Sequence, residues 1–269
     1  MGQGIAQACA YSGYEVRIYD ISEELIHKGI TLIDRSLQSL AEKGKINSEQ
    51  KGNILSRIKP QPILKSLKAD LIIEAAVEKL DIKKELFSAL EAVNQDTCIL
   101  TTNTSSIPVT QIASALKNPS RFAGLHFFNP APVMKLVEVI RGEATNPETL
   151  TMLKRFSESL GKICVEAKDS PGFIVNRVAR HYYVEALKLV EENVADIQTV
   201  DQLMRSCGFK LGPFELMDLI GVDTNFSVTT SIYNAFHQDP KFRPSRIQQQ
   251  KVDAGHHGRK TGKGFYDYQ

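Results

Sequence analysis

The sequence predicts an α/β domain built on a parallel sheet, followed by an all-α domain. Up to residue 170, short apolar runs of strand length alternate with amphipathic helical segments. That alternation is typical of a parallel sheet covered by helices on both faces. From Ile174 onward only helical patterns occur, interrupted by glycines and by Pro240. We therefore expect two domains, residues 1–170 and residues 171–269.

The composition is that of an ordinary globular protein. Of the 269 residues, 42% are apolar and 24% are charged, which allows a substantial core and excludes a disordered chain. The formal net charge of +2 lacks the basic excess typical of proteins that bind nucleic acid or anionic membranes. No apolar run is long enough to span a bilayer, and no secretory leader pattern is visible, so we expect a cytoplasmic protein.

The cysteines indicate neither disulfides nor a metal site. The four of them are far apart in the sequence, with no CxxC pair and no Cys/His cluster: Cys9, Cys98, Cys164 and Cys207. We expect buried, reduced thiols and no bound metal.

The first elements follow one another closely. A run of small and apolar residues predicts a helix that begins at Gly2 and ends before Gly13. The polar and apolar alternation of 15–20 predicts a strand that ends at Asp20. Ser22, followed by two acids, is a candidate N-cap for a long helix over 22–43. A second helical pattern covers 48–58, just before Pro60.

The rest of the first domain continues the alternation. The patterns predict strands at 71–75, 97–102, 121–127, 135–140 and 163–167, and helices at 80–93, 109–116 and 146–160.

The beginning of the chain matches the second half of a dinucleotide-binding, Rossmann-like fingerprint. Gly2 opens a helix whose N–H groups would suit a pyrophosphate, and Asp20 follows at a strand end, where an acid binds ribose hydroxyls. A carboxylate there favours NAD over NADP. The first strand and the first two glycines of the fingerprint are absent, and their loss should leave two neighbouring strands unpaired. A chance pattern, with Asp20 as a simple turn acid, is the alternative.

A histidine and a glutamate form the candidate catalytic pair. His126 lies near the end of a predicted strand, before Asn129-Pro130. Glu138 lies in the next strand on the same face as Leu136 and Ile140, where a buried carboxylate needs a partner. The intervening turn could bring the two side chains together, and the carboxylate would then fix the imidazole tautomer. A core histidine without catalytic function is the alternative.

Two further polar segments are candidates. Thr101–Ser106 follows a buried strand and offers hydroxyl and amide groups at the same sheet edge, although it could simply cap a turn. Asn176 stands in the apolar start of a helix, where it could face a cleft or solvent. Gly258–Gly264 looks like a phosphate-binding P-loop but has His257 and Gly264 where that motif needs Gly and Ser/Thr.

Together these blocks resemble the L-3-hydroxyacyl-CoA dehydrogenase family, especially its short bacterial 3-hydroxybutyryl-CoA members. The resemblance covers the whole chain. It is carried by Met1–Ala10, Glu74–Lys79, Asn103–Pro108, Gly124–Ile140, Asp169–Arg177 and Gly258–Tyr268.

The resemblance implies a role for each matching residue. His126 would be the general base and Glu138 would orient it, while Ser105 and Asn176 would hold the substrate oxygens. Further matches are to NAD-binding positions (Gly2, Asp20, Glu78, Lys83 and Asn103) and to coenzyme A contacts (Ser36 and Lys43). The helical domain would form a homodimer.

Two alternatives stay open. Members of this family begin with a strand and Gly-x-Gly, which this chain lacks, so we expect a start site assigned too late. The first hypothesis is an active dehydrogenase, and the second is a truncated, non-catalytic fragment. A third hypothesis is a dehydrogenase with the same chemistry that acts on another hydroxy acid. The sequence does not indicate the acyl chain length, the reaction direction or the pathway.

Overall fold

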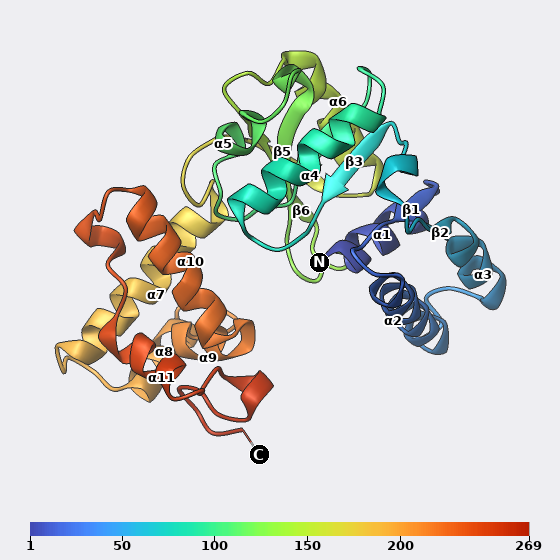
Figure 1. The fold of residues 1–269 in the computed structure, drawn as a ribbon. Coiled ribbons are helices and arrows are strands. Elements are labelled where there is room, and N and C mark those ends of the chain that lie inside the picture. The colour runs from blue at the N-terminus through green and yellow to red at the C-terminus, as the bar shows by residue number, and fades with distance from the viewer. Residues whose placement is uncertain (269) are drawn as a thin grey trace. The chain divides into compact units, whose positions relative to one another are not determined.

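The computed structural model describes residues 1–268. The chain forms two compact units, Met1–Asp169 and Ser170–Gln269. The predicted fold class is confirmed, because a mainly parallel sheet with helices occupies the first unit and helices make up the second (Figure 1).

The first unit contains the predicted alternation of helices and strands. Its elements are α1 (Gly2–Tyr11), β1 (Val16–Ile18), α2 (Glu23–Glu42), α3 (Ser48–Ser56), β2 (Ile58–Pro60), β3 (Leu71–Glu74), α4 (Leu80–Val93), β4 (Ile99–Thr102), α5 (Val109–Ala113), β5 (Phe122–Phe127), β6 (Leu136–Arg141), α6 (Pro147–Ser159) and β7 (Ile163–Lys168). The hydroxyl of Ser22 accepts the N–H of Leu25 and so caps α2 as predicted.

The main sheet has the strand order β3-β4-β5-β6-β7. Every neighbouring pair is parallel except β5 and β6. A parallel pair needs a long crossover, whereas the short connection through Asn129–Pro132 can join only antiparallel neighbours. The predicted parallel sheet therefore contains one antiparallel pair, β5 and β6.

A strand was missed next to α3. The helical pattern predicts a helix to residue 58, but α3 ends at Ser56, and Ile58–Pro60 pairs in parallel with β1. Three residues that end in proline are too few to give an alternating pattern, so only the partner strand reveals this one.

The sheet is divided where the sequence analysis expects a missing strand. Among residues 1–268, β1 pairs only with β2, and β3 pairs only with β4. Val16 of β1 and Ile73 of β3 are only partly buried. Both strands are therefore edges, each with one ladder of backbone groups unpaired by another strand.

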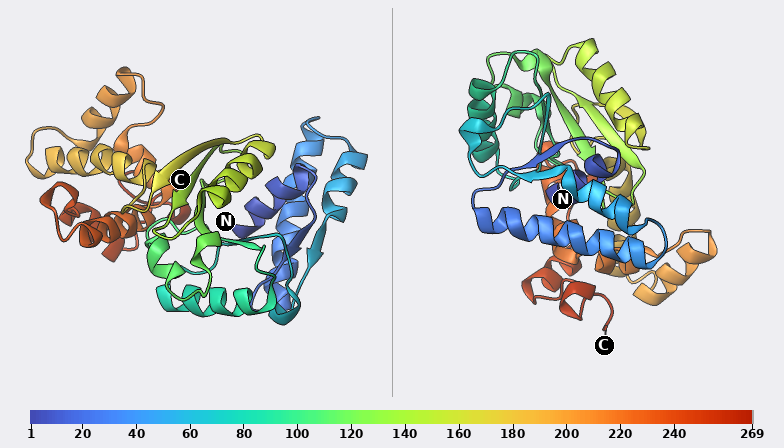
Figure 2. Two further views of the ribbon diagram at one scale, coloured as in Figure 1. Left: turned by 90° about the horizontal axis from the view of Figure 1, so that it is seen from above. Right: turned by 90° about the vertical axis from the view of Figure 1, so that its right-hand side faces the viewer.

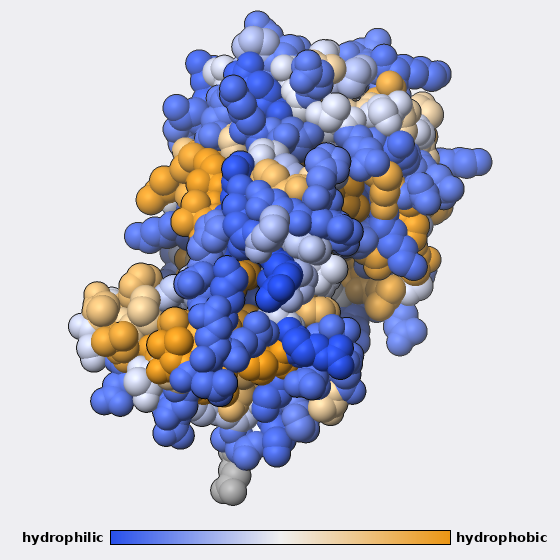
Figure 3. Space-filling model, turned by 90° about the vertical axis from the view of Figure 1, so that its left-hand side faces the viewer, coloured by the Kyte–Doolittle hydropathy of each residue, from blue (hydrophilic) through white to orange (hydrophobic). Residues whose placement is uncertain are grey.

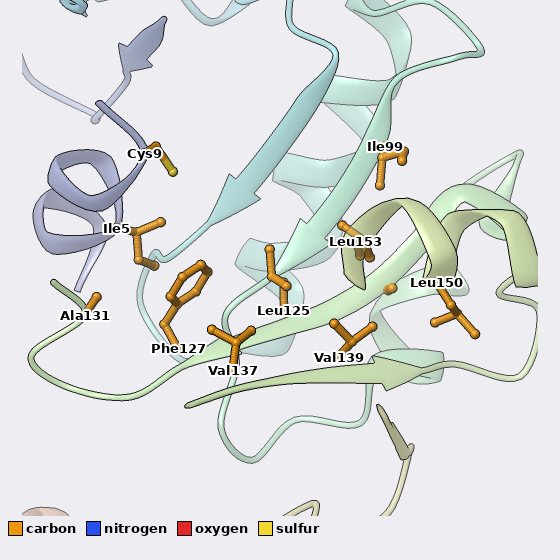
Figure 4. Close-up of a cluster of buried hydrophobic side chains, with 11 residues drawn as sticks. Ile5, Cys9, Ile99, Leu125, Phe127, Ala131, Val137, Val139, Leu150 and Leu153 are labelled. Atoms are coloured by element: carbon orange, nitrogen blue, oxygen red, sulfur yellow. The ribbon is translucent and has the colours of Figure 1, made fainter. Parts of the chain in front are cut away.

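Helices cover both faces of the main sheet (Figure 2). Helices α1 and α6 pack on one face, in a cluster that contains Ile5, Leu125, Val137 and Leu153 (Figure 4). Helices α4 and α5 cover the other face, where the ring of Phe87 packs edge-on against Phe122. Because side chains alternate along a strand, His126 and Glu138 belong to this second face.

The second unit is helical. Its helices are α7 (Val175–Glu191), α8 (Ile197–Ser206), α9 (Pro213–Ile220), α10 (Val222–Ala235) and α11 (Arg246–Asp253). Tyr183, Leu187, Phe214 and Met217 are among the side chains of its core.

The glycine-rich segment that resembles a P-loop closes the helical unit. The buried carboxylate of Asp218 accepts the N–H groups of Phe265 and Tyr266 and the hydroxyl of Tyr268, each at 2.9 Å. A Cβ at Gly264 would overlap this carboxylate. The segment therefore serves a structural purpose in which glycine is needed for close approach.

Candidate active site

Polar side chains gather where strands β3, β4 and β5 end. Glu74 is the last residue of β3, Asn103 directly follows β4, and His126 is the penultimate residue of β5. These three strands are parallel neighbours, so their carboxyl ends share one edge of the sheet. Ligands of open α/β sheets bind at such an edge.

His126 and Glu138 form a buried pair. They are directly opposite each other in the antiparallel register of β5 and β6, and His126 Nδ1 lies 2.8 Å from Glu138 Oε2. The side chains are 7% and 1% exposed. The predicted pairing is confirmed, and the contact assigns the Nδ1 proton to the imidazole–carboxylate bond, which sets the ring tautomer.

Asn103 ties the end of β4 to the end of β5. Its Oδ1 accepts the N–H of Phe127 at 2.8 Å, one residue after the histidine. Its own N–H donates to the carbonyl of Glu74 at 2.8 Å. Asn103, which is predicted to lie near nicotinamide, thus links three strand ends through its side chain and its backbone N–H.

A buried ion network supports this edge. Lys83 in α4 is 1% exposed, and its Nζ lies 2.6 Å from Glu74 Oε1 and 3.2 Å from Glu78 Oε2. The other oxygen of Glu74 accepts the hydroxyl of Thr102 at 2.7 Å. The carboxylates of Glu74 and Glu78 thus compensate the charge of Lys83, as a buried charge requires.

Glu78 organises the turn that holds Ser105. Its Oε1 accepts the hydroxyl of Thr104 and the N–H groups of Ser105 and Ser106. Burial alone would raise the pKa of Glu78, but these hydrogen bonds and the charge of Lys83 outweigh it and hold the pKa below its ordinary value. The turn is therefore built around an ionised carboxylate.

The two dinucleotide-binding candidates lie on α1 and beyond β1. Gly2 is the first residue of α1, and a Cβ placed on it would lie 3.7 Å from the Cβ of Ala75, just beyond β3. Asp20 is exposed, and its Oδ1 accepts the N–H of Ile21 at 2.7 Å. A helix N-terminus and a strand-end carboxylate are thus both present, and they fit the pyrophosphate and ribose of a dinucleotide.

Ser36 lines a pocket near the end of β5. The pocket lies between α1, α2 and the loop after β5, and its lining includes Gln7, Ile33, Ser36 and Asn129–Pro132. Lys162 holds this loop, because its Nζ donates to the carbonyls of Ala131 and Met134 at 2.7 and 2.8 Å. Burial lowers the pKa of Lys162.

Lys43 does not line this pocket. It is the exposed C-cap of α2, seven residues and thus about two turns beyond Ser36. The two candidate coenzyme A contacts therefore share one side of the helix.

Asn176 belongs to the helical unit. It is the second residue of α7 and is half-buried, and its carbonyl accepts the Nε–H of Arg180 at 3.2 Å.

Glu74 is not among the site residues predicted from the sequence. The signal was present, since an acid in a buried strand needs a partner, and this same argument identified Glu138. Within the described residues no group of three or more His, Cys, Asp or Glu side chains could hold a metal ion. No helix in the same range has the length and apolarity needed to cross a bilayer.

Known family models match both parts of the chain. Residues 1–170 match the model of the 3-hydroxyacyl-CoA dehydrogenase NAD-binding domain, and residues 172–268 match that of the 3-hydroxyacyl-CoA dehydrogenase C-terminal domain. The chain belongs to the 3-hydroxyacyl-CoA dehydrogenase family. The resemblance inferred from the sequence is confirmed, and the dehydrogenase class and its NAD cofactor follow from the family.

Individual relatives agree with this family. A 3-hydroxyadipyl-CoA dehydrogenase of Escherichia coli is 49% identical over all of this chain, which spans 57% of that protein's length. A probable 3-hydroxybutyryl-CoA dehydrogenase of Bacillus subtilis is 40% identical, and the chain covers 94% of it. The crystal structure of (S)-3-hydroxybutyryl-CoA dehydrogenase from Ralstonia eutropha superimposes with a TM-score of 0.96 at 40% identity, covering all of this chain and 95% of that one.

Proposed function

We propose that this chain interconverts (S)-3-hydroxyacyl-CoA and 3-oxoacyl-CoA with NAD, and that His126 is the general base. The observation that carries the proposal is the buried contact between His126 Nδ1 and Glu138 Oε2. With its Nδ1 proton directed to a carboxylate, the imidazole can take the 3-hydroxyl proton on Nε2. Glu138 then stabilises the imidazolium that forms, while Ser105 and Asn176 hold the substrate oxygens.

The chain offers suitable groups for the cofactor. The first N–H groups of α1 would face the pyrophosphate, and Asp20 would bind the ribose hydroxyls and repel a 2′-phosphate. NAD, when bound, supplies the acceptor for the hydride that leaves C3 of the substrate. Glu78 and Lys83 would fix the turn that carries Ser105.

The first experiment is an assay of NADH oxidation with acetoacetyl-CoA. We expect turnover by the wild-type chain and a decrease of about 10²- to 10⁴-fold in kcat for His126→Gln, with unchanged thermal stability. Equal turnover by His126→Gln would refute the general-base assignment. If neither acetoacetyl-CoA nor longer 3-oxoacyl-CoA esters oxidise NADH, the proposed activity itself is wrong.

We also propose a homodimer formed by the helical unit. Val178 and Tyr182 lie four residues apart on one side of α7, and the ring of Phe209 stacks on that of Tyr182 with centroids 4.9 Å apart. Val178 is 67% exposed and Phe209 is 51% exposed. We call these three residues the apolar strip. Figure 3 shows one face of the molecule, on which patches of apolar side chains lie among hydrophilic ones. Exposed apolar groups of this kind favour association.

A cytoplasmic location is part of the same proposal. All four cysteines are free thiols. Unpaired cysteines suit a reducing compartment.

A further inference from the structure

Arg180 carries a buried positive charge that the proposed reaction does not use. It lies in α7 and is 3% exposed, although arginine is almost never fully buried unless it is paired. Its neighbours are on α7 itself and on α10, so it lies between these two helices.

Every hydrogen bond of this guanidinium goes to a neutral group. Nη1 donates to the carbonyl of Asn225 and to the hydroxyl of Thr229, both at 3.0 Å, and Nε donates to the carbonyl of Asn176. The guanidinium also lies over the ring of Tyr183, 4.8 Å from its centroid. Among residues 1–268, Nη2 has no hydrogen-bond partner.

No carboxylate compensates this charge. In the described part of the chain, Arg180 takes part in no ion pair, in contrast to the buried Lys83 with its two glutamates. Burial accordingly lowers the pKa of Arg180 to about 10. Nearby, Asn225 Nδ2 is a buried donor without a partner, and Gln248 Oε1 is a buried acceptor without one. The cluster as a whole is under-satisfied by protein groups, and a carboxylate would accept from both unpaired donors.

The position of Arg180 indicates which part of the substrate would carry this carboxylate. It follows Asn176 by four residues, which is one turn or about 5.4 Å along α7. Asn176 is the residue proposed to hold a substrate oxygen close to C3. A few carbons of an acyl chain bridge one helical turn, whereas the phosphates of coenzyme A lie at the opposite end of the ester.

We propose that Arg180 binds a carboxylate at the far end of the acyl chain, so that the preferred substrate is a 3-hydroxyacyl-CoA derived from a dicarboxylic acid. This inference rests on the proposed function and specifies its substrate class. The carboxylate would accept a charge-assisted hydrogen bond from the guanidinium and neutralise a charge that the protein itself leaves uncompensated.

The test uses two substrates of equal length. 3-Oxoadipyl-CoA and 3-oxohexanoyl-CoA both have six-carbon acyl chains and differ only in the terminal carboxylate. We expect the wild-type chain to favour 3-oxoadipyl-CoA in kcat/KM by roughly 30-fold or more. Arg180→Met should remove most of this preference while keeping activity on 3-oxohexanoyl-CoA. Arg246→Met, which changes an exposed arginine of the same unit, is the matched control and should keep the preference.

A binding experiment separates recognition from turnover. Adipyl-CoA and hexanoyl-CoA have no 3-hydroxyl or 3-oxo group, so calorimetry with them measures binding alone. The wild-type chain should bind adipyl-CoA more tightly, which also tests the inference if Arg180→Met does not fold.

The outcomes distinguish the two proposals. Wild-type turnover of 3-oxohexanoyl-CoA without preference for the dicarboxylic ester would overturn the inference and leave the proposed function intact. An equal loss on both esters in Arg180→Met, or a changed oligomeric state, would make Arg180 a structural residue. Absence of turnover with every ester would instead contradict the proposed function.

Discussion

At the scale of single residues, the site depends on buried charges that have specific partners. Glu138 is 1% exposed, and its contact with His126 lies within the sheet rather than in a loop. A strand pair holds its side chains more rigidly than a loop does, which would suit the proposed general base, because that base must keep one tautomer.

The first prediction concerns Glu138→Gln. The amide keeps the size of the side chain but loses the charge that stabilises the imidazolium. We expect kcat with acetoacetyl-CoA to fall by about 10²- to 10⁴-fold, with a smaller effect on KM. A pH–rate profile of the variant that matches the wild type would show that the pairing has no part in catalysis.

The second prediction concerns Glu78 and pH. The pKa of Glu78 is lowered in the folded chain. Its contribution to stability is therefore present above the unfolded carboxyl pKa of about 4.3 and is lost as the pH falls through the folded value. We expect Glu78→Gln to lower the melting temperature at about pH 6, and this difference from wild type to shrink as the pH falls toward about 3.

The exposed Glu85, on the same helix as Lys83, provides the control. Glu85→Gln should leave the melting temperature nearly unchanged at both pH values. A stability difference between Glu78→Gln and wild type that stays constant from acid to neutral pH would argue against an ionised Glu78.

At the scale of elements, patterns along the chain predict the helices and strands that depend on local sequence. The strand at 121–127 and the strand at 135–140 were recognisable because each has an apolar run of strand length, and the turn between them placed His126 beside Glu138. The Glu74–Lys83–Glu78 network was not predictable in the same way. It joins β3, α4 and the turn after β4, and such contacts depend on tertiary packing.

The strand β2 and the burial of Arg180 were also not predictable from local sequence. Ile58–Pro60 becomes a strand only because β1 lies beside it. An arginine is usually exposed, yet α10 covers Arg180. In both cases the neighbouring element, not the local pattern, decides the outcome.

The third prediction tests the C-terminal segment as an element. In Gly264→Ala the added methyl group would overlap the carboxylate of Asp218, which also holds Phe265 and Tyr268. We expect a loss of about 1–3 kcal/mol in the free energy of unfolding, measured by urea denaturation.

Gly29→Ala is the matched comparison. A Cβ at Gly29, inside α2, meets nothing within 4 Å. Because alanine favours a helix over glycine, this variant should gain about 0.5–1 kcal/mol. If Gly264→Ala were as stable as wild type, the close contact with Asp218 would not be a constraint on the fold.

At the scale of the whole molecule, charge and apolar surface favour self-association. A net charge of +2 gives little repulsion between copies. The two residues of the apolar strip on α7, Val178 and Tyr182, are each two residues beyond Asn176 and Arg180, a rotation of about 200° around the helix. Val178 and Tyr182 are therefore on the opposite side of α7 from Asn176 and Arg180.

The fourth prediction follows from this separation. In Phe209→Glu a charge replaces the ring stacked on Tyr182, and burying that charge against a second copy would be costly. We expect light scattering after gel filtration to give a dimer for the wild-type chain and a monomer for the variant. Met152→Glu alters a similarly exposed apolar residue of α6 in the other unit and should stay dimeric. A monomeric wild-type chain, or a dimeric Phe209→Glu, would show that the apolar strip does not join two copies. Because the strip lies away from Arg180, the Phe209→Glu monomer should retain the preference for a dicarboxylic ester.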